Sequence, residues 1–137
     1  MKLFVFGTLK AGFPLHHNLA GAKLLGYYRT VQRFPMVVAG PWFAPMLLDQ
    51  PGQGLQVKGE LYEIHDRQLA VLDQLESVGK PGNFRRVADV ESIATGTSDK
   101  AFIFMKSPQL ASPIHTSNLE DYQDNRFVPP DQRSPCE

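Results

Sequence analysis

One carboxylate in this sequence stands among leucines at helical spacing. On a helix with about 100° between successive residues, Glu76 projects onto the same arc as Leu69, Leu72 and Leu75. Burial disfavours the charged form of a carboxylate, and the negative end of the helix dipole acts in the same direction, so both effects raise its pKa. Such a group can accept a proton near neutral pH and return it later, which is general acid–base chemistry. Glu76 is therefore the candidate catalytic residue.

Two other interpretations of this predicted helix stay open. Glu76 can instead lie at the edge of the leucine stripe, where it reaches water or pairs with Arg85 or Arg86 and does no chemistry. Asp73 is the second acid on the same helix, and it projects farther from the centre of the stripe. We therefore rank Asp73 behind Glu76 as a proton carrier.

A second candidate site follows an apolar run near the beginning of the chain. Residues 3–6 predict a strand that is buried on both faces, and Gly7 then provides backbone freedom that other residues lack. Gly7 and Thr8 add little side-chain bulk, so the N–H groups of this loop can face an anion such as a carboxylate. The alternative interpretation is that Gly7 simply ends the strand.

The elements that must position these groups follow from the spacing of apolar residues and turn formers. A helix is predicted over residues 67–77, with Asp66 as its N-cap and Gly79 as the residue that stops it. Residues 12–19 predict one or two helical turns. Strand-forming residues between turn signals predict further strands at 23–31, 34–38, 45–48, 57–64, 84–90 and 100–105.

These elements predict an α+β fold in one domain. About six strands with one strong helix, and no regular alternation between them, favour a mostly antiparallel sheet that can close on itself. The length of 137 residues fits a single domain covering residues 1–137. Gly59, inside a predicted strand, indicates a bulge or a backbone that packs closely against another group. Prolines from residue 108 onward predict an irregular, Pro-rich C-terminal tail from about residue 107 that wraps the domain.

Charge and cysteine content argue against several classes of protein. Fourteen Lys and Arg residues balance fourteen Asp and Glu residues, so no nucleic-acid partner is expected. The single cysteine, Cys136, cannot form an intrachain disulfide, and no segment has the apolar length of a signal peptide or a membrane span. We therefore expect a cytoplasmic location without a membrane partner. The histidines lack metal-ligand spacing and no nucleotide-binding motif is complete, so no metal and no cofactor are expected.

Four fragments, taken together, resemble the gamma-glutamylcyclotransferase family and, within it, the gamma-glutamylamine cyclotransferase branch. They are residues 4–10 (FVFGTLK), 34–40 (FPMVVAG), 59–62 (GELY) and 72–77 (LDQLES), in the order and at the spacing of the family. The resemblance implies a small mixed β-barrel with flanking helices. It also implies an enzyme that releases 5-oxoproline from a gamma-glutamyl compound and frees an amine or amino acid. On this basis Phe6, Gly7, Thr8 and Leu9 match the substrate-holding loop, and Glu76 matches the proton-transferring glutamate.

The residue chemistry fits that reaction. The α-amine of the substrate attacks its own γ-carbonyl to close a five-membered ring, so no protein nucleophile is required. The protein must hold the α-carboxylate, for which amides from Gly7 to Leu9 are suited, and must deprotonate the ammonium, for which Glu76 is suited. Arg86 matches an arginine of the family that we interpret as structural, pairing with a carboxylate.

The sequence departs from the family at aromatic positions and leaves other functions open. Phenylalanine replaces a frequent tyrosine at Phe6, Phe84, Phe104 and Phe127, which removes hydroxyls that could bond a substrate. This departure favours a second hypothesis, a non-catalytic domain that binds a gamma-glutamyl or other small carboxylate metabolite. A third hypothesis is an interaction domain whose Pro-rich tail docks on a partner. The residues do not identify the leaving amine, the pathway or the oligomeric state.

Overall fold

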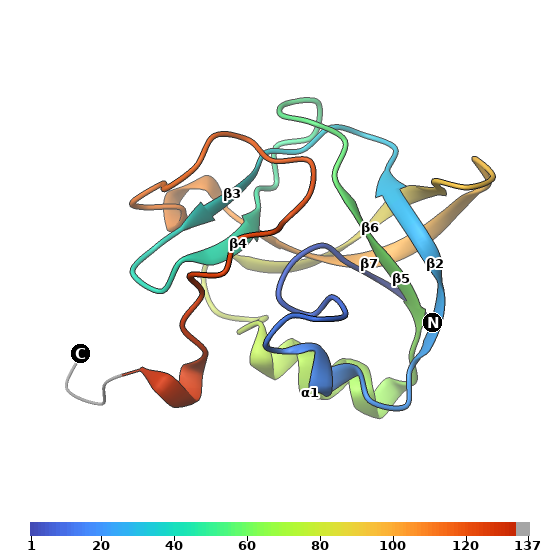
Figure 1. The fold of residues 1–137 in the computed structure, drawn as a ribbon, viewed down its shortest axis with the longest axis horizontal. Helices are drawn as coiled ribbons and strands as arrows, with labels where there is room; N and C mark the ends of the chain where they lie inside the picture. Colours follow the sequence, from blue (N-terminus) through green and yellow to red (C-terminus); the bar gives the residue numbers. More distant parts are fainter. Residues whose placement is uncertain (134–137) are drawn as a thin grey trace.

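The centre of the molecule is a closed barrel of five strands in the order β1-β5-β2-β6-β7 (Figure 1). The computed structural model describes residues 1–133 of the chain. The barrel strands are β1 (Lys2–Val5), β2 (Lys23–Thr30), β5 (Lys58–Glu63), β6 (Asn83–Ser92) and β7 (Ser98–Lys106). Neighbouring strands are antiparallel except for β1 and β7, which close the barrel in parallel. The expected α+β fold with a small mixed, mostly antiparallel barrel is therefore confirmed.

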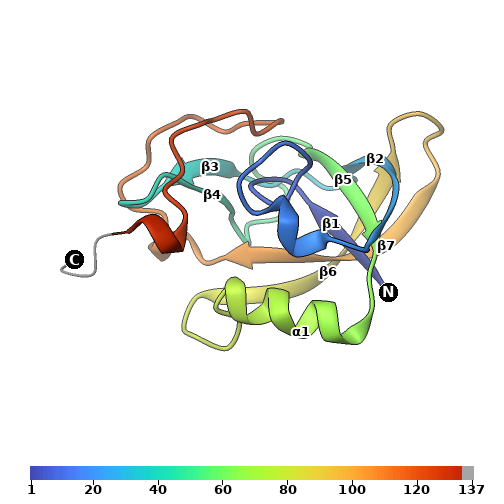
Figure 2. The same cartoon turned by 60° about the horizontal axis from the view of Figure 1, so that its bottom comes forward.

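The remaining elements lie around the barrel (Figures 1 and 2). A two-stranded antiparallel sheet of β3 (Met36–Ala39) and β4 (Ala44–Leu47) stands beside it, and the helix α1 (Asp66–Leu75) covers one of its sides. Short 3-10 helices are formed by η1 (His16–Leu19), η2 (Pro108–Leu110) and η3 (Pro130–Gln132). Along residues 1–133, no helix has the length and apolar character that crossing a membrane requires.

The strand β1 is buried on both faces, as its uninterrupted apolar sequence predicted. Phe4 points into the cluster inside the barrel, which includes Leu61 and Ile103. Leu3 and Val5 point the other way, into a second cluster with Leu69 and Leu72 of α1 and Phe104 of β7. Successive side chains of a strand point to opposite faces, so one short strand joins the barrel interior to the helix.

The ends of α1 differ from those predicted. His65, not Asp66, is the N-cap, and its Nδ1 accepts a hydrogen bond from the Gln68 N–H at 3.4 Å. The helix ends at Leu75, and Glu76 is its C-cap. Ser77 already has a positive φ of 59°, so the chain leaves the helix before Gly79 is reached. Glu76 therefore stands at the first position beyond the helix rather than within its last turn.

The C-terminal segment follows the barrel and the β3–β4 sheet, mostly without regular structure (Figure 1). The N–H of His115 donates to the Val38 carbonyl and that of Leu119 to the Met36 carbonyl, each at 2.8 Å. The N–H of Lys58 in β5 donates to the Glu120 carbonyl at 2.7 Å. Pro135 and Cys136, on which sequence predictions were made, lie outside the described residues.

Candidate active site

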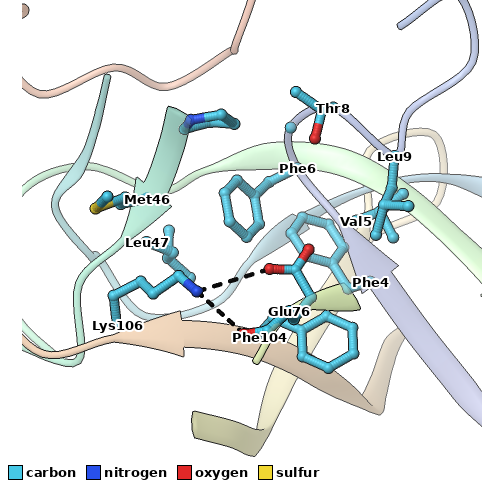
Figure 3. A pocket seen from close by; sticks show the side chains of 12 residues that line it. Phe4, Val5, Phe6, Thr8, Leu9, Met46, Leu47, Glu76, Phe104 and Lys106 are labelled. Carbon is cyan, nitrogen blue, oxygen red and sulfur yellow. Dashed lines mark hydrogen bonds and ion pairs between the residues drawn. The ribbon is translucent and has the colours of Figure 1, made fainter. Parts of the chain in front are cut away.

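A pocket opens where the loop after β1 meets β4, the end of α1 and the end of β7 (Figure 3). It encloses about 390 Å³, part of it open to solvent, which is within the usual range for small-molecule sites. The residues that line it are Phe4, Val5, Phe6, Gly7, Thr8, Leu9, Pro45, Met46, Leu47, Glu76, Phe104 and Lys106. The structure thus brings together Glu76 and all four residues of the predicted substrate loop.

The substrate loop is shaped by hydrogen bonds to its carbonyl groups. The Gly7 carbonyl accepts from the N–H of Lys10 at 3.0 Å, and the Thr8 carbonyl accepts from the N–H of Leu15 at 3.0 Å. The Leu9 carbonyl accepts from Nδ1 of His16 at 2.9 Å. Every carbonyl of this tripeptide is therefore bound to the segment that follows it.

The N–H groups of the same tripeptide are in the opposite situation. For Gly7, Thr8 and Leu9, no acceptor is found within the described chain, although all three residues are buried. Buried backbone N–H groups without a partner are rare, because each loses its hydrogen bond to water. Three adjacent donors beside a pocket are suited to an anion such as a carboxylate.

Gly7 is required by packing rather than by its backbone conformation. A Cβ at this position would lie 2.6 Å from Cγ and 3.0 Å from Cβ of Pro45 in β4. Its φ lies outside the left-handed region that other glycines of this chain adopt, so the expected conformational role was wrong. Gly59 shows the close packing that was one of its two predicted roles, since a Cβ there would lie 2.3 Å from the Val5 carbonyl oxygen.

Glu76 faces the pocket and lies beside Lys106, the last residue of β7 (Figure 3). The Glu76 side chain is 23% exposed, and its Oε2 stands 3.8 Å from Nζ of Lys106, whose side chain is 18% exposed. The Lys106 ammonium donates to the Glu76 carbonyl at 3.2 Å and to Oδ1 of Asn83 at 2.6 Å. The predicted alternative partners of Glu76, Arg85 and Arg86, were therefore wrong.

Burial and charge act in opposite directions on both members of this pair. Burial raises the pKa of Glu76, and the Lys106 ammonium lowers it by a smaller amount, so the net shift is upward. Burial lowers the pKa of Lys106, and the Glu76 carboxylate raises it by a smaller amount, so the net shift is downward. The pocket thus holds a carboxyl group that takes up a proton more readily than an exposed glutamate does.

The two arginines have other carboxylate partners. Arg85 places Nε 2.9 Å from Oδ1 of Asp73, and a guanidinium nitrogen of Arg86 lies 3.0 Å from Oδ2 of Asp49. Asp73, the rival acid on the helix, is thereby paired and is not among the residues that line the pocket. Arg86 pairs with a carboxylate, as its structural interpretation expected.

Sequence reasoning missed Lys106, although the strand pattern contained a signal for it. In β7, Ala101, Ile103 and Met105 face the barrel interior, and Phe102 and Phe104 face the outer cluster. The period of two places Lys106 on the same face as Phe104, which lines the pocket. Two of the four phenylalanines that replace tyrosines, Phe6 and Phe104, also line the pocket, whereas Phe84 and Phe127 do not.

Comparisons with known proteins agree with this architecture. A gamma-glutamylaminecyclotransferase of Bos taurus is 33% identical over 126 residues, which cover 88% of this chain and 74% of the bovine protein. The crystal structure of an AIG2-like protein from Mus musculus has a TM-score of 0.80 and 31% identity, covering 96% of this chain and 97% of the mouse chain. Against a Drosophila melanogaster relative, 42% identical over 80 residues, the chain spans only about half the length, 51%.

The match to the family as a whole is more extensive. The sequence model of the gamma-glutamyl cyclotransferase, AIG2-like family covers residues 3–124, which include β1, the substrate loop, Glu76 and Lys106. The chain therefore belongs to the gamma-glutamyl cyclotransferase, AIG2-like family.

Proposed function

We propose that this protein is a gamma-glutamylcyclotransferase-type enzyme that converts a gamma-glutamyl compound into 5-oxoproline and a free amine or amino acid. The observation that carries the proposal is the shared pocket of a buried carboxyl group, Glu76, and three adjacent N–H groups without an acceptor in the described chain, those of Gly7, Thr8 and Leu9. Family membership supports the same reaction. No protein nucleophile is needed for it, because the attacking amine belongs to the substrate.

In this proposal the loop after β1 holds the glutamyl group of the substrate. The N–H groups of Gly7, Thr8 and Leu9 donate to its α-carboxylate, which provides the acceptors that the described chain does not offer them. The apolar walls of the pocket, which include Phe4 and Phe6, contact the methylene groups of the glutamyl chain. The γ-carbonyl and the α-amine are thereby held close to each other and to Glu76, and such orientation can be equivalent to effective molarities of about 10⁵–10⁸ M.

Glu76 then acts twice on the same proton. As a carboxylate it accepts a proton from the α-ammonium, and the free amine nitrogen forms a bond to the γ-carbon. The bond between the γ-carbon and the leaving nitrogen then breaks, and Glu76 returns the proton to that nitrogen. The raised pKa of Glu76 suits both steps, because the group is a better base than an exposed glutamate and still ionises near neutral pH.

The test is release of 5-oxoproline from a panel of gamma-glutamyl amines and gamma-glutamyl amino acids. We expect Glu76→Gln to lower kcat by about 10²- to 10⁴-fold, the usual contribution of a general acid–base group. Asp73→Asn is the matched control on the same helix, since Asp73 pairs with Arg85 outside the pocket, and it should keep most of the activity. Absence of product with every compound, or full activity of Glu76→Gln, would overturn the proposal.

The second candidate function is a non-catalytic domain that binds a small carboxylate metabolite. It is favoured by the pocket wall, where Phe6 and Phe104 carry no hydroxyl and Thr8 alone among the described lining residues does. Calorimetric titration with gamma-glutamyl compounds separates the two. Saturable binding with recovery of intact ligand supports the binding domain, and conversion of the ligand during the titration supports the enzyme.

A further inference from the structure

Lys106 is set apart from the other lysines of the chain by where its ammonium is held. It lines the pocket, and its Nζ donates to Asn83 Oδ1 at 2.6 Å and to the carbonyl of Glu76 at 3.2 Å, which fixes the position of the charge. We propose that Lys106 is a positioning residue whose ammonium, held by Asn83 and by the end of α1, is the fixed counter-charge of the Glu76 carboxylate. This inference rests on the proposed role of Glu76 as the proton carrier.

The separation between the two charged groups suits that role. Nζ of Lys106 lies 3.8 Å from Oε2 of Glu76, beyond ordinary hydrogen-bond length, so the positive charge acts on the carboxylate without occupying its oxygen atoms. Those oxygens stay available to the ammonium of a substrate. Asn83 is itself oriented, because its amide nitrogen donates to the Pro81 carbonyl at 3.1 Å, which leaves Oδ1 for the lysine.

The charges around Glu76 show why a counter-charge is needed. From β7, Lys106 faces Glu76; from β6 and α1, Arg85 and Asp73 are the nearby charged groups, and they pair with each other. When a glutamyl compound enters with its α-carboxylate and α-ammonium, the pocket holds two anions, and the substrate ammonium balances only one. Lys106 balances the second, before and after the proton moves to Glu76, so the total charge is zero throughout. In a site of low dielectric constant an unbalanced carboxylate would be protonated instead.

The direct test is the titration of Glu76 itself, measured by ¹³C NMR of glutamate carboxyl groups in the wild-type protein and in Lys106→Met. The signal is assigned by its loss in Glu76→Gln. We expect the midpoint of Glu76 to rise by about one pH unit or more in Lys106→Met, because burial then acts without an opposing cation. Lys100→Met is the matched control on the same strand, since Lys100 is 74% exposed and pairs with Asp89 at the surface, and it should leave the midpoint unchanged.

A second variant separates charge from packing. Lys106→Arg keeps the positive charge and should restore most of the wild-type midpoint, whereas a purely structural role of the lysine side chain would not be rescued in this way. Should Lys106→Met fail to fold, Asn83→Ala removes the group that fixes the ammonium, and the proposal then requires a smaller rise in the same midpoint. An unchanged or lowered Glu76 midpoint in these variants would overturn the proposal.

The kinetic counterpart is the acid limb of kcat/KM for 5-oxoproline release. It should move to higher pH in Lys106→Met by the same amount as the NMR midpoint, with about a tenfold loss of kcat/KM below the midpoint for each pH unit. A higher KM with an unmoved acid limb would show that Lys106 binds the substrate instead, and would overturn the counter-charge role. A shifted NMR midpoint in a protein that releases no 5-oxoproline would instead refute the proposed function and leave the pairing of Lys106 and Glu76 in place.

Discussion

At the scale of single residues, the pocket keeps a carboxyl group in surroundings that oppose its charge. The pKa of Glu76 in the folded protein is raised above its ordinary value by burial. A carboxyl group with a raised folded pKa binds more protons in the folded than in the unfolded state at intermediate pH. Its ionisation therefore destabilises the fold above the folded pKa, and this effect disappears as the pH falls below the unfolded value. Lys106 reduces the destabilisation at neutral pH.

The stability of the pair gives a prediction that does not depend on activity. Lys106→Met leaves Glu76 without its cation, and we expect it to lower the free energy of unfolding at pH 8 by about 1–3 kcal/mol, below the roughly 3–5 kcal/mol for breaking a fully buried pair. The difference should shrink as the pH falls towards 4, because Glu76 becomes neutral. Urea denaturation at the two pH values measures both quantities.

The double variant Glu76→Gln with Lys106→Met provides the control for this prediction. It removes both charges together, so we expect its stability at pH 8 to lie close to that of the wild-type protein. A double variant that is destabilised by the sum of the two single changes would show that the charges do not interact.

At this scale the sequence predicted one member of the pair and not the other. Glu76 was identifiable because it shares the arc of the leucines that face the barrel. Lys106 lies thirty positions away, and its contact with Glu76 depends on how the end of β7 is aligned with the end of α1. The strand period gives the face on which Lys106 lies, but not the helix end that it meets.

At the scale of elements, the site depends on how closely β4 approaches the loop after β1. Gly7→Ala would bring a methyl group within 2.6 Å of Pro45 Cγ, and we expect it to lower the free energy of unfolding by about 1–3 kcal/mol through overpacking. It should also lower kcat/KM, because the loop that presents the N–H groups must shift. Thermal unfolding and 5-oxoproline release measure the two effects.

A compensating change tests this explanation. Pro45→Ala removes Cγ but retains Cβ, which would lie 3.0 Å from the new methyl group, so the combination with Gly7→Ala should recover part of the lost stability. No recovery would locate the cause elsewhere in the loop.

The element boundaries show what local sequence could and could not predict. Strands and turns followed from strand-forming residues and glycines, and the hairpin of β6 and β7 was expected but is longer than predicted. The parallel pairing of Leu3 with Phe102, which closes the barrel, joins residues from opposite ends of the matched region. Such pairing depends on the overall topology and leaves no signal in either strand alone.

At the scale of the whole molecule, the C-terminal segment is part of the core rather than a separate arm. Tyr122 is fully buried, and its ring lies 5.3 Å from that of Phe13, centroid to centroid. The buried side chain of Lys10 places its Nζ 2.9 Å from both Asp121 Oδ1 and the Tyr122 carbonyl. Lys10 directly follows the substrate loop, so the segment around residue 122 also supports the loop. The prolines predicted the irregular course of this segment, but a single buried tyrosine within it had no distinguishing pattern.

Tyr122 therefore tests whether the segment stabilises the fold and the loop together. Its hydroxyl is buried without a hydrogen-bond partner in the described part of the chain, and burial raises its pKa to about 12. We expect Tyr122→Phe to leave stability unchanged or to raise it by about 1 kcal/mol, because an unpaired polar group is removed. Tyr122→Ala should lower the free energy of unfolding by about 3–5 kcal/mol, as for other large aromatic side chains. It should also raise KM, because Lys10 loses a fixed partner beside the substrate loop, whereas Tyr122→Phe should leave KM unchanged. Urea denaturation and 5-oxoproline kinetics on the two variants measure these effects, and a Tyr122→Ala protein with wild-type stability would show that the segment is not part of the core.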